Sequence, residues 1–290
     1  MRGTHFFGRF MARHTSYYIY PNEVEMIARH AADISRIVGA NPSVIELGPG
    51  SELSVSQKTL PLLRVLNPVS YIPVDCAESY LDGAVVTVRR ILPDIKIMPE
   101  CCNFYDTYFA FEHLENPLGC MWSSTISNAP LDGTLLALPR AHIIHMLRCF
   151  RVLLGSKSWL TLTVDSNQDE DSILGSYDSQ DLADFMQNLI HLIIRDLPTT
   201  GLDPNCFVYE PVWHAEHHLL AHTLRVLKDH SFLIGAQSYS VQKGQSLCLA
   251  TSFKYPLSLF CSMAREAGFE SREVFPDDQN RVSLHLLRAI

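Results

Sequence analysis

The sequence predicts a doubly wound α/β sheet that is interrupted by a second, inserted domain. Three observations carry this prediction: strand-like and helix-like segments alternate up to residue 165, the pattern then changes to a helix followed by alternating strands, and a final helix and strand return at the C-terminal end. Alternating strands and helices build parallel sheets, because each crossover helix returns the chain to the end of the sheet at which the previous strand began. The change of pattern after residue 165 indicates the insertion.

The first stretch shows apolar residues at helical spacing in its helices and short apolar runs in its strands. The helix over 139–154 has proline in its first turn and Gly155 just past its end, which are the usual start and stop signals. We expect strands at 44–47, 71–74, 95–98, 120–123 and 159–164, and helices at 22–39, 58–66, 79–92 and 139–154.

The second stretch is expected to fold as helix plus antiparallel strands. A helix is predicted at 181–197, and residues 206–254 alternate as strands, with Leu220, His222, Leu224 and Val226 on one face. A helix over 257–267, ended by Gly268, and a strand over 282–287 then return to the first sheet. The expected domains are 29–167 with 254–290, and 1–28 with 168–253.

Composition excludes several classes of partner. Of 290 residues, 47% are hydrophobic and 19% charged, and the net charge is −8, as in ordinary globular proteins. No basic cluster exceeds the pair Arg89-Arg90, which argues against nucleic acid or an anionic membrane as the main partner. No apolar run approaches the length of a membrane span.

Eight scattered cysteines form no C-x-x-C pair, so neither a zinc site nor a disulfide framework is indicated. We expect reduced thiols in a cytoplasmic protein. The first 22 residues contain three arginines and no acid, which leaves a mitochondrial transit peptide as the alternative.

A glycine-rich strand end is the most informative local feature. The apolar strand at 44–47 contains Glu46 and runs into Gly48 and Gly50, which lack the Cβ that would block a ligand from the backbone. Asp75 ends the next strand, where a carboxylate can accept from ribose hydroxyls. A third glycine and a G-K-[ST] motif are missing, so a nucleoside cofactor without a pyrophosphate fits best, and S-adenosylmethionine is the commonest. The alternative is an ordinary strand–loop–helix with a tight turn.

Six motifs occur in order from about residue 17 to the C-terminal end. They are Tyr20-Pro21-x-x-x-Glu25, Glu46-Leu47-Gly48-Pro49-Gly50-Ser51 with Lys58-Thr59, Ile72-Pro73-Val74-Asp75, Ser123-Ser124-Thr125-Ile126-Ser127-Asn128, Ser176-Tyr177-Asp178 and Ser252-Phe253-Lys254-Tyr255. Together they resemble the ergothioneine-pathway histidine Nα-methyltransferases, a family that includes fungal relatives acting on prenylated tryptophan. The resemblance implies a Rossmann-type methyltransferase sheet over 29–167 and 254–290 that binds S-adenosylmethionine. It also implies an α+β substrate-binding domain over 1–28 and 168–253.

The resemblance also implies roles for individual residues. Asp75 would accept from the cofactor ribose, and Gly48, Gly50 and Ser51 would line its methionine part. Asn103 and Phe104 would bracket the adenine where the family has Asp-Phe, and an amide can still bond the adenine amino group. Glu46, Lys58 and Ser123 complete the expected cofactor site.

For the substrate, the resemblance implies that Asn128 and Tyr177 grip the amino and carboxylate groups and that Tyr20 contacts the amino acid; these three are the catalytic candidates. The alternatives are a turn cap for Asn128, before Pro130, and packing roles for the two tyrosines.

The side-chain pocket departs from the histidine enzymes. Ser252 is present, but Ala250 stands where those enzymes have an imidazole-binding glutamate, and His222 falls where they have a methionine. Losing the acid removes a charge-assisted hydrogen bond and enlarges the pocket. We therefore expect a substrate other than histidine, such as a larger aromatic or modified amino acid. The segment before Tyr20 is also shorter than the family's arm.

Two polar clusters have residue types that could bind a metal ion. His214, His218 and His222 would form a ligand face on a helix, but the alternation favours a strand, and we expect no metal. The acidic run from Asp165 to Asp171 is expected to be a solvated loop near the cofactor rather than a cation site.

The sequence as a whole predicts an S-adenosylmethionine-dependent N-methyltransferase of biosynthesis that acts on the amino group of an amino acid or an amino-acid-derived metabolite other than histidine. We expect a small-molecule substrate and a monomer or weak homo-oligomer. The alternatives are a histidine Nα-methyltransferase, an enzyme of peptide termini or amine natural products, and an inactive methyltransferase fold that serves as a binding or regulatory protein.

Overall fold

The structure is a computed structural model that describes residues 10, 11, 13–104, 111, 114–128 and 139–290. The chain forms two compact units. The large unit comprises Ile19–Ser127, Leu138–Asn167 and Tyr255–Ile290, and the small unit comprises Met1–Tyr18, Asn128–Ala137 and Gln168–Lys254. These limits differ from the expected ones at residues 19–28, which belong to the large unit, and at Asn128 and Lys254, which belong to the small unit.

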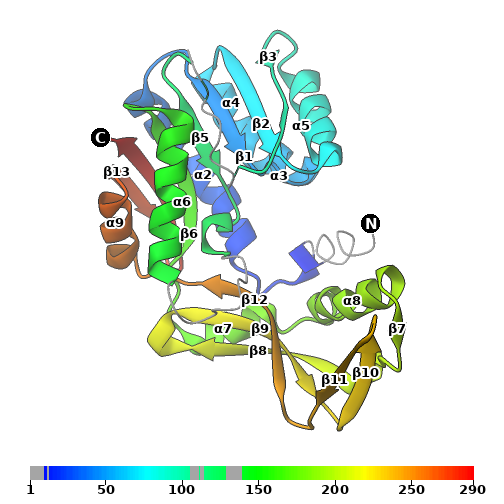
Figure 1. Ribbon diagram of the computed structural model, residues 1–290. Helices are drawn as coiled ribbons and strands as arrows, with labels where there is room; N and C mark the ends of the chain where they lie inside the picture. The colour runs from blue at the N-terminus through cyan, green and yellow to red at the C-terminus, as the bar shows by residue number, and fades with distance from the viewer. Residues whose placement is uncertain (1–9, 12, 105–110, 112–113, 129–138) are drawn as a thin grey trace. The chain divides into compact units, whose positions relative to one another are not determined.

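The large unit is built on one mixed sheet with a parallel core (Figure 1). Its strand order is β13-β14-β6-β5-β1-β2-β3, with β4 also paired to β2. Strands β1, β2, β5 and β6 run parallel, whereas β14 and β13 are antiparallel. The doubly wound sheet predicted from the sequence is therefore confirmed. The strands are β1 (Ser43–Leu47), β2 (Ser70–Asp75), β3 (Lys96–Ile97), β4 (Glu100–Cys101), β5 (Leu118–Met121), β6 (Trp159–Asp165), β13 (Phe269–Pro276) and β14 (Val282–Ala289).

Helices cover both faces of this sheet, which explains why every residue of β1 and β6 is buried. Helices α6 and α9 pack together in front of the sheet in Figure 1, and α2 lies behind it with α4. The helices of this unit are α2 (Ile19–Val38), α3 (Glu52–Ser54), a π-helical turn (Val55–Thr59), α4 (Leu60–Leu66), α5 (Glu78–Ile91), α6 (Pro139–Leu154) and α9 (Leu257–Glu266).

Some element limits differ from the sequence prediction. The helix expected from residue 58 begins at Glu52, because the Ser51 hydroxyl caps it by accepting from the Ser54 N–H at 3.3 Å. Strand β13 was not predicted, since it is an edge strand whose residues are mostly exposed and lack an apolar alternation.

Over the described residues 168–254, the small unit contains two α-helices and two three-stranded antiparallel sheets, β12-β9-β8 and β11-β10-β7. Its core joins Ile190 of the second helix to Phe207, Leu224 and Val226 of the strands. The predicted inserted α+β domain is thus confirmed. Its elements are α7 (Glu170–Tyr177), α8 (Gln180–Asp196), β7 (Thr199–Thr200), β8 (Phe207–His214), β9 (Leu219–Val226), β10 (His230–Ile234), β11 (Gln237–Val241) and β12 (Ser246–Phe253).

The acidic run was predicted as a solvated loop, and this prediction is right only in part. Residues 166–169 form a loop in which Asp169 is exposed, but the two ends of the run belong to regular elements. Asp165 is the last residue of β6 and is fully buried. The Asp169 side chain caps α7 by accepting from the Ser172 N–H at 2.9 Å, and Glu170 and Asp171 form the first turn of the helix. Acidic residues stabilise this helix start by bonding free N–H groups and by facing the positive end of the helix dipole.

Two of the three spaced histidines lie on strands, and none of the three lies on an α-helix. His214 ends β8, His222 lies within β9, and His218 occupies the turn between them with φ +52°. The described residues contain no group of three His, Cys, Asp or Glu side chains that could hold a metal ion. In the same part of the chain, no helix has the length and apolarity that crossing a bilayer requires.

Candidate functional site

The large unit brings its predicted cofactor residues to the carboxyl ends of β1, β2 and β5. Strand β1 lies between β2 and β5, so the chain order reverses at this point of the sheet. Open α/β sheets bind their ligands in the crevice outside the carboxyl ends of such strands. The site is therefore where the sheet topology alone would put it.

The loop after β1 exposes its backbone to the adjoining aromatic residue. Gly48 and Gly50 adopt φ values of +75° and +69°, which residues with a Cβ rarely accept. The Gly48 N–H donates to the Val74 carbonyl at 2.9 Å and ties the turn to β2. A Cβ on Gly48 would lie 3.7 Å from the Phe104 ring, so glycine keeps the space beside that ring open.

Asp75 ends β2 with half of its carboxylate engaged. Its Oδ1 accepts from the Ala77 N–H at 2.9 Å, which fixes the side chain at the start of α5. Within the described residues, its Oδ2 makes no hydrogen bond and can accept from a ligand hydroxyl. Asn103 is exposed and Phe104 half-buried, just beyond β4, which pairs with the end of β2.

Glu46 is a buried carboxylate that supports the carboxyl end of β1. This carboxylate is fully buried in β1 and accepts hydrogen bonds from the hydroxyls of Thr59 and Tyr71. Burial raises its pKa above the usual range, against the lowering effect of these hydrogen bonds. With both oxygens engaged and no exposed surface, Glu46 positions the strand end and the π-helical turn.

Lys58 is the centre of a second buried network. Its ammonium donates to a Glu23 carboxylate oxygen at 2.5 Å and to the Ser123 hydroxyl at 2.7 Å. It also lies 4.5 Å from the centre of the Tyr20 ring, whose hydroxyl donates to the Gln57 side-chain oxygen at 2.8 Å. Burial, and then the charge of Glu23, raise the pKa of Tyr20 to about 12. Tyr20 is therefore a neutral hydroxyl at physiological pH.

Sequence reasoning missed Glu23. The matched motif pointed to Glu25, but that side chain is exposed and pairs with Arg29. Glu23 is fully buried and also accepts from the Thr163 hydroxyl of β6. Only the rotation of α2 about its axis decides which of the two acids faces Lys58, and the sequence gives no separate signal for it.

In the small unit, four predicted substrate residues come together. The Tyr177 ring at the end of α7 meets the His222 ring edge to face, with 5.2 Å between centres. Ala250 of β12 is the direct cross-strand partner of His222 in β9. Ser252 lies two residues further along β12, on the same face as Ala250.

Two further residues complete this cluster. The fully buried ammonium of Lys254 donates to the Tyr177 hydroxyl at 2.8 Å and to the Ser252 hydroxyl at 3.0 Å. The Tyr209 hydroxyl lies 2.8 Å from Nδ1 of His222. Burial, and then the charge of Lys254, lower the pKa of His222 to about 3, so its imidazole is neutral. The S-F-K-Y run signalled Lys254, whereas nothing in the sequence singled out Tyr209.

The three catalytic candidates do not form one described cluster. Tyr20 lies with Lys58 and Ser123 in the large unit, and Tyr177 lies with Lys254 in the small unit. Asn128 is exposed and follows the 3-10 turn over Thr125–Ser127.

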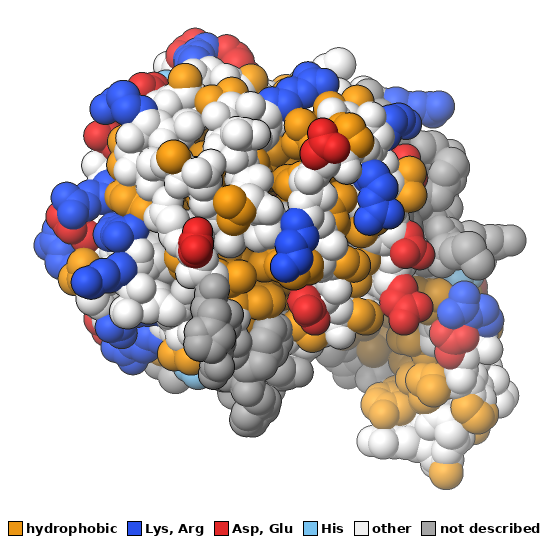
Figure 2. All heavy atoms as spheres, turned by 90° about the horizontal axis from the view of Figure 1, so that it is seen from above, with side chains coloured by type: hydrophobic (Ala, Val, Ile, Leu, Met, Phe, Trp, Pro, Cys, Tyr) orange, Lys and Arg blue, Asp and Glu red, His pale blue; other side chains and the backbone are white. Residues whose placement is uncertain are grey.

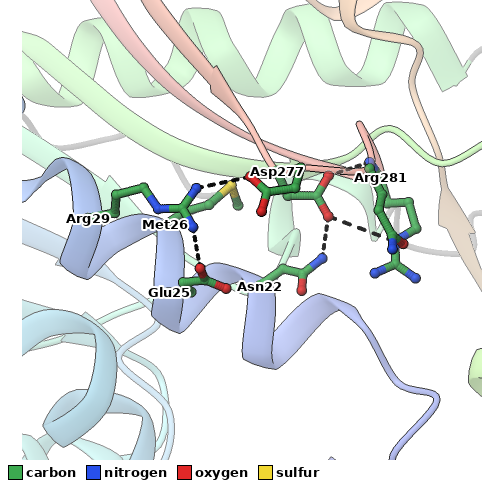
Figure 3. Close-up of a pocket in the computed structure, with 8 residues that line it drawn as sticks. Asn22, Glu25, Met26, Arg29, Asp277 and Arg281 are labelled. Atoms are coloured by element: carbon green, nitrogen blue, oxygen red, sulfur yellow. Dashed lines mark hydrogen bonds and ion pairs between the residues drawn. The ribbon is translucent and has the colours of Figure 1, made fainter.

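One polar cavity contains none of the predicted site residues. It measures about 150 Å³ and lies between α2 and the turn that joins β13 to β14 (Figure 3). Its charged side chains pair with one another: Arg29 with Glu25 and Asp278, and Arg281 with Asp277. These ion pairs give the cavity a structural role in holding α2 to the hairpin. Its lining residues are Asn22, Glu25, Met26, Arg29, Asp277, Asp278, Gln279 and Arg281.

The two clusters differ in what they can bind. The large unit offers open backbone, an aromatic face and a carboxylate oxygen, which suit a nucleoside. The small unit offers a buried ammonium with two hydroxyls, which suits a carboxylate. On the face seen in Figure 2, Lys and Arg are interspersed with Asp and Glu, which is the pattern of an ordinary solvated surface.

Comparison with known proteins identifies the family. The family model for histidine-specific, S-adenosylmethionine-dependent methyltransferases matches residues 1–289. An uncharacterised protein of Sinorhizobium fredii is 27% identical over 86% of this chain and 81% of its own length. The N-methyltransferase dtpB of Aspergillus flavus is 22% identical over 91% of this chain and 75% of its own. The N-methyltransferase benX of Aspergillus terreus is 25% identical over 92% and 76%.

Solved structures share the fold. An S-adenosylmethionine-dependent methyltransferase of Clostridium acetobutylicum superposes with a TM-score of 0.52 at 8% identity, covering 93% of this chain and 92% of its own. The CcbJ methyltransferase of Streptomyces caelestis gives 0.51 at 17% identity, covering 91% and 95%. With the family match over nearly the whole chain, these findings establish that the chain belongs to the histidine-specific, S-adenosylmethionine-dependent methyltransferase family and is an S-adenosylmethionine-dependent N-methyltransferase.

Proposed function

We propose that this enzyme methylates the α-amino nitrogen of an amino acid, or of a metabolite derived from one, and that histidine is not its substrate. One observation carries the proposal. Ala250 stands where the histidine methyltransferases that this chain resembles have a glutamate, and it faces His222 across the β9–β12 pair. A methyl group there cannot accept the imidazole N–H. The neutral ring of His222 does not replace the missing charge.

The large unit would hold the cofactor. Asp75 has one carboxylate oxygen to accept from ribose hydroxyls, and Phe104 beside Gly48 provides a face for the adenine. Gly48, Gly50 and Ser51 would line the methionine part, with Asn103 at the adenine edge. S-adenosylmethionine supplies a methyl group on a sulfonium. Lys58 is engaged by Glu23 and Ser123, which supports a role in shaping this site rather than direct binding.

The small unit would hold the amino acid. The Lys254 ammonium and the Tyr177 and Ser252 hydroxyls form a charge-assisted site for the substrate carboxylate. Tyr177, Tyr20 and Asn128 would orient the amino nitrogen so that its lone pair faces the methyl group. Alignment and exclusion of water supply most of the catalysis of such a displacement. The oxygen of the neutral Tyr20 hydroxyl can accept a hydrogen bond from the N–H of the substrate amine without removing its proton.

The deciding experiment is methyl transfer from a deuterated cofactor to single amino acids, followed by mass spectrometry. We expect products from non-histidine amino acids and negligible label on histidine. Ala250→Glu should raise histidine turnover about ten- to a hundredfold, by restoring one charged acceptor. Ala250→Gln is the control, because it has the same length without the charge. Efficient trimethylation of histidine by the unmodified protein would contradict the proposal.

Histidine itself is the second candidate, because the matched family is described as histidine-specific. The same assay decides between the two. We further propose a cytoplasmic, monomeric or weakly associating enzyme of a biosynthetic pathway; the scattered cysteines support a reducing compartment.

A further inference from the structure

The Tyr209 hydroxyl and the His222 imidazole share a hydrogen bond in the small unit. Strands β8 and β9 put Pro211 opposite His222, so Tyr209 is a diagonal neighbour whose long side chain reaches the imidazole. The His222 side chain is 6% exposed, and its Nδ1 lies 2.8 Å from the Tyr209 hydroxyl. The two rings are nearly parallel, at 16°.

The direction of this hydrogen bond decides which ring nitrogen carries the proton. The ring is neutral because burial and the Lys254 charge lower its pKa to about 3, so only one of its nitrogens holds a hydrogen. The Tyr209 hydroxyl has one hydrogen, and among the described residues its only acceptor is Nδ1 of His222. With the Tyr209 hydroxyl as the donor, Nδ1 accepts and the ring proton is on Nε2.

The Nε2–H group is left for another molecule. In the described part of the chain, Nε2 of His222 makes no hydrogen bond. The facing residue on β12 is Ala250, whose methyl group is no acceptor. His222 is only 6% exposed, so its Nε2–H has little access to water, and a ligand that supplies an acceptor would bond it. The rings of Tyr177 and Tyr209 flank the imidazole and suit an aromatic body.

We infer that the substrate is an aromatic amino acid whose side chain carries a hydrogen-bond-accepting oxygen, such as a phenol or a ring carbonyl, which receives the N–H of His222. This inference rests on the proposed function and narrows its substrate class. A side chain that offers only a donor, such as an indole N–H, would oppose a second donor. Tyr209 acts as a positioning residue, because it selects the tautomer without touching the substrate.

The tautomer can be measured without any substrate. Long-range proton–nitrogen correlation spectra of protein with labelled histidine distinguish protonated from bare ring nitrogens, and His222→Gln identifies the His222 signals. We expect Nε2 protonated in the unmodified protein and a mixture of tautomers in Tyr209→Phe, which lacks only the hydroxyl. A proton fixed on Nδ1 in the unmodified protein would overturn the inference.

Calorimetry with S-adenosylhomocysteine present then compares tyrosine, phenylalanine and tryptophan as probes. We expect tyrosine to bind about tenfold more tightly than phenylalanine, the worth of one hydrogen bond to a buried donor, and tryptophan to bind no better than phenylalanine. Tyr209→Phe and His222→Met should bring the tyrosine-to-phenylalanine ratio near one, whereas a purely structural defect would weaken all three probes alike.

The outcomes separate the two claims. Equal affinity for tyrosine and phenylalanine, or a preference for tryptophan, would overturn the inference and leave amino-acid methylation standing. Binding of S-adenosylhomocysteine with no affinity for any amino acid would overturn both the inference and the proposed function.

Discussion

Replacing Asp75 tests the cofactor site with a graded pair of variants. Its Oδ1 already bonds the Ala77 N–H, and its Oδ2 is the oxygen that can accept from ribose. Asp75→Ala removes both acceptors and should cost about 1.5–3 kcal/mol of cofactor binding, or roughly 10- to 150-fold in Kd. Asp75→Asn keeps a neutral acceptor for Ala77, so we expect about a tenfold loss, because a charge-assisted bond becomes a neutral one.

Stability should separate the two functions of Asp75. Loss of the Ala77 bond at the start of α5 lowers the free energy of unfolding of Asp75→Ala by about 0.5–2 kcal/mol, while Asp75→Asn stays near the unmodified protein. Glu100→Gln is the matched control, because it removes an exposed negative charge from the adjoining β4. Calorimetric titration with S-adenosylhomocysteine measures affinity. Unchanged affinity in Asp75→Ala, or an equal loss in Glu100→Gln, would refute the ribose role.

Three other predictions concern the turn, the substrate grip and acid stability. Gly48→Ala should lose about 1–2 kcal/mol of stability from its left-handed backbone, as should the control Gly155→Ala, but only Gly48→Ala should also weaken S-adenosylhomocysteine binding in a titration. Tyr177→Phe and Asn128→Ala should weaken amino-acid binding far more than cofactor binding; a variant that loses only the cofactor would contradict the assignment. Burial lowers the pKa of His285 to about 3, as it does that of His222, so the unfolded chain binds protons that the native state does not. The free energy of unfolding should therefore fall as the pH drops from about 6.5 toward 3, by up to about 1.4 kcal/mol per pH unit per histidine. Thermal melts at pH 7 and 5 measure this change. In His285→Gln, the dependence of the unfolding free energy on pH should decrease by the amount that one proton contributes. An unchanged melting temperature of the unmodified protein between these pH values would contradict the prediction.

Much of the large unit follows from local pattern. Apolar runs ended by Gly48 and by Asp75 mark two neighbouring parallel strands, and their spacing leaves room for one crossover helix. Because the carboxyl ends of parallel strands meet at one edge, these two residues had to lie close together. The ends of helices were less predictable, since capping by Ser51 or Asp169 depends on a single side-chain bond.

The side-chain networks could not be read from the sequence. Lys254 and Glu23 look like surface residues by type, and only tertiary packing buries them. The contact between Tyr209 and His222 depends on the register of β8 and β9. That register is set by a turn in which His218 takes a left-handed conformation, which the sequence does not announce.

The most direct test of the account is one competition experiment. The purified protein is incubated with deuterated S-adenosylmethionine and an equimolar mixture of the standard amino acids, and the labelled products are identified by mass spectrometry. The account predicts label on the α-amino nitrogen of an aromatic amino acid whose ring carries an oxygen. Tyrosine should receive more label than phenylalanine or tryptophan, and histidine a negligible amount. Label on histidine alone would contradict it.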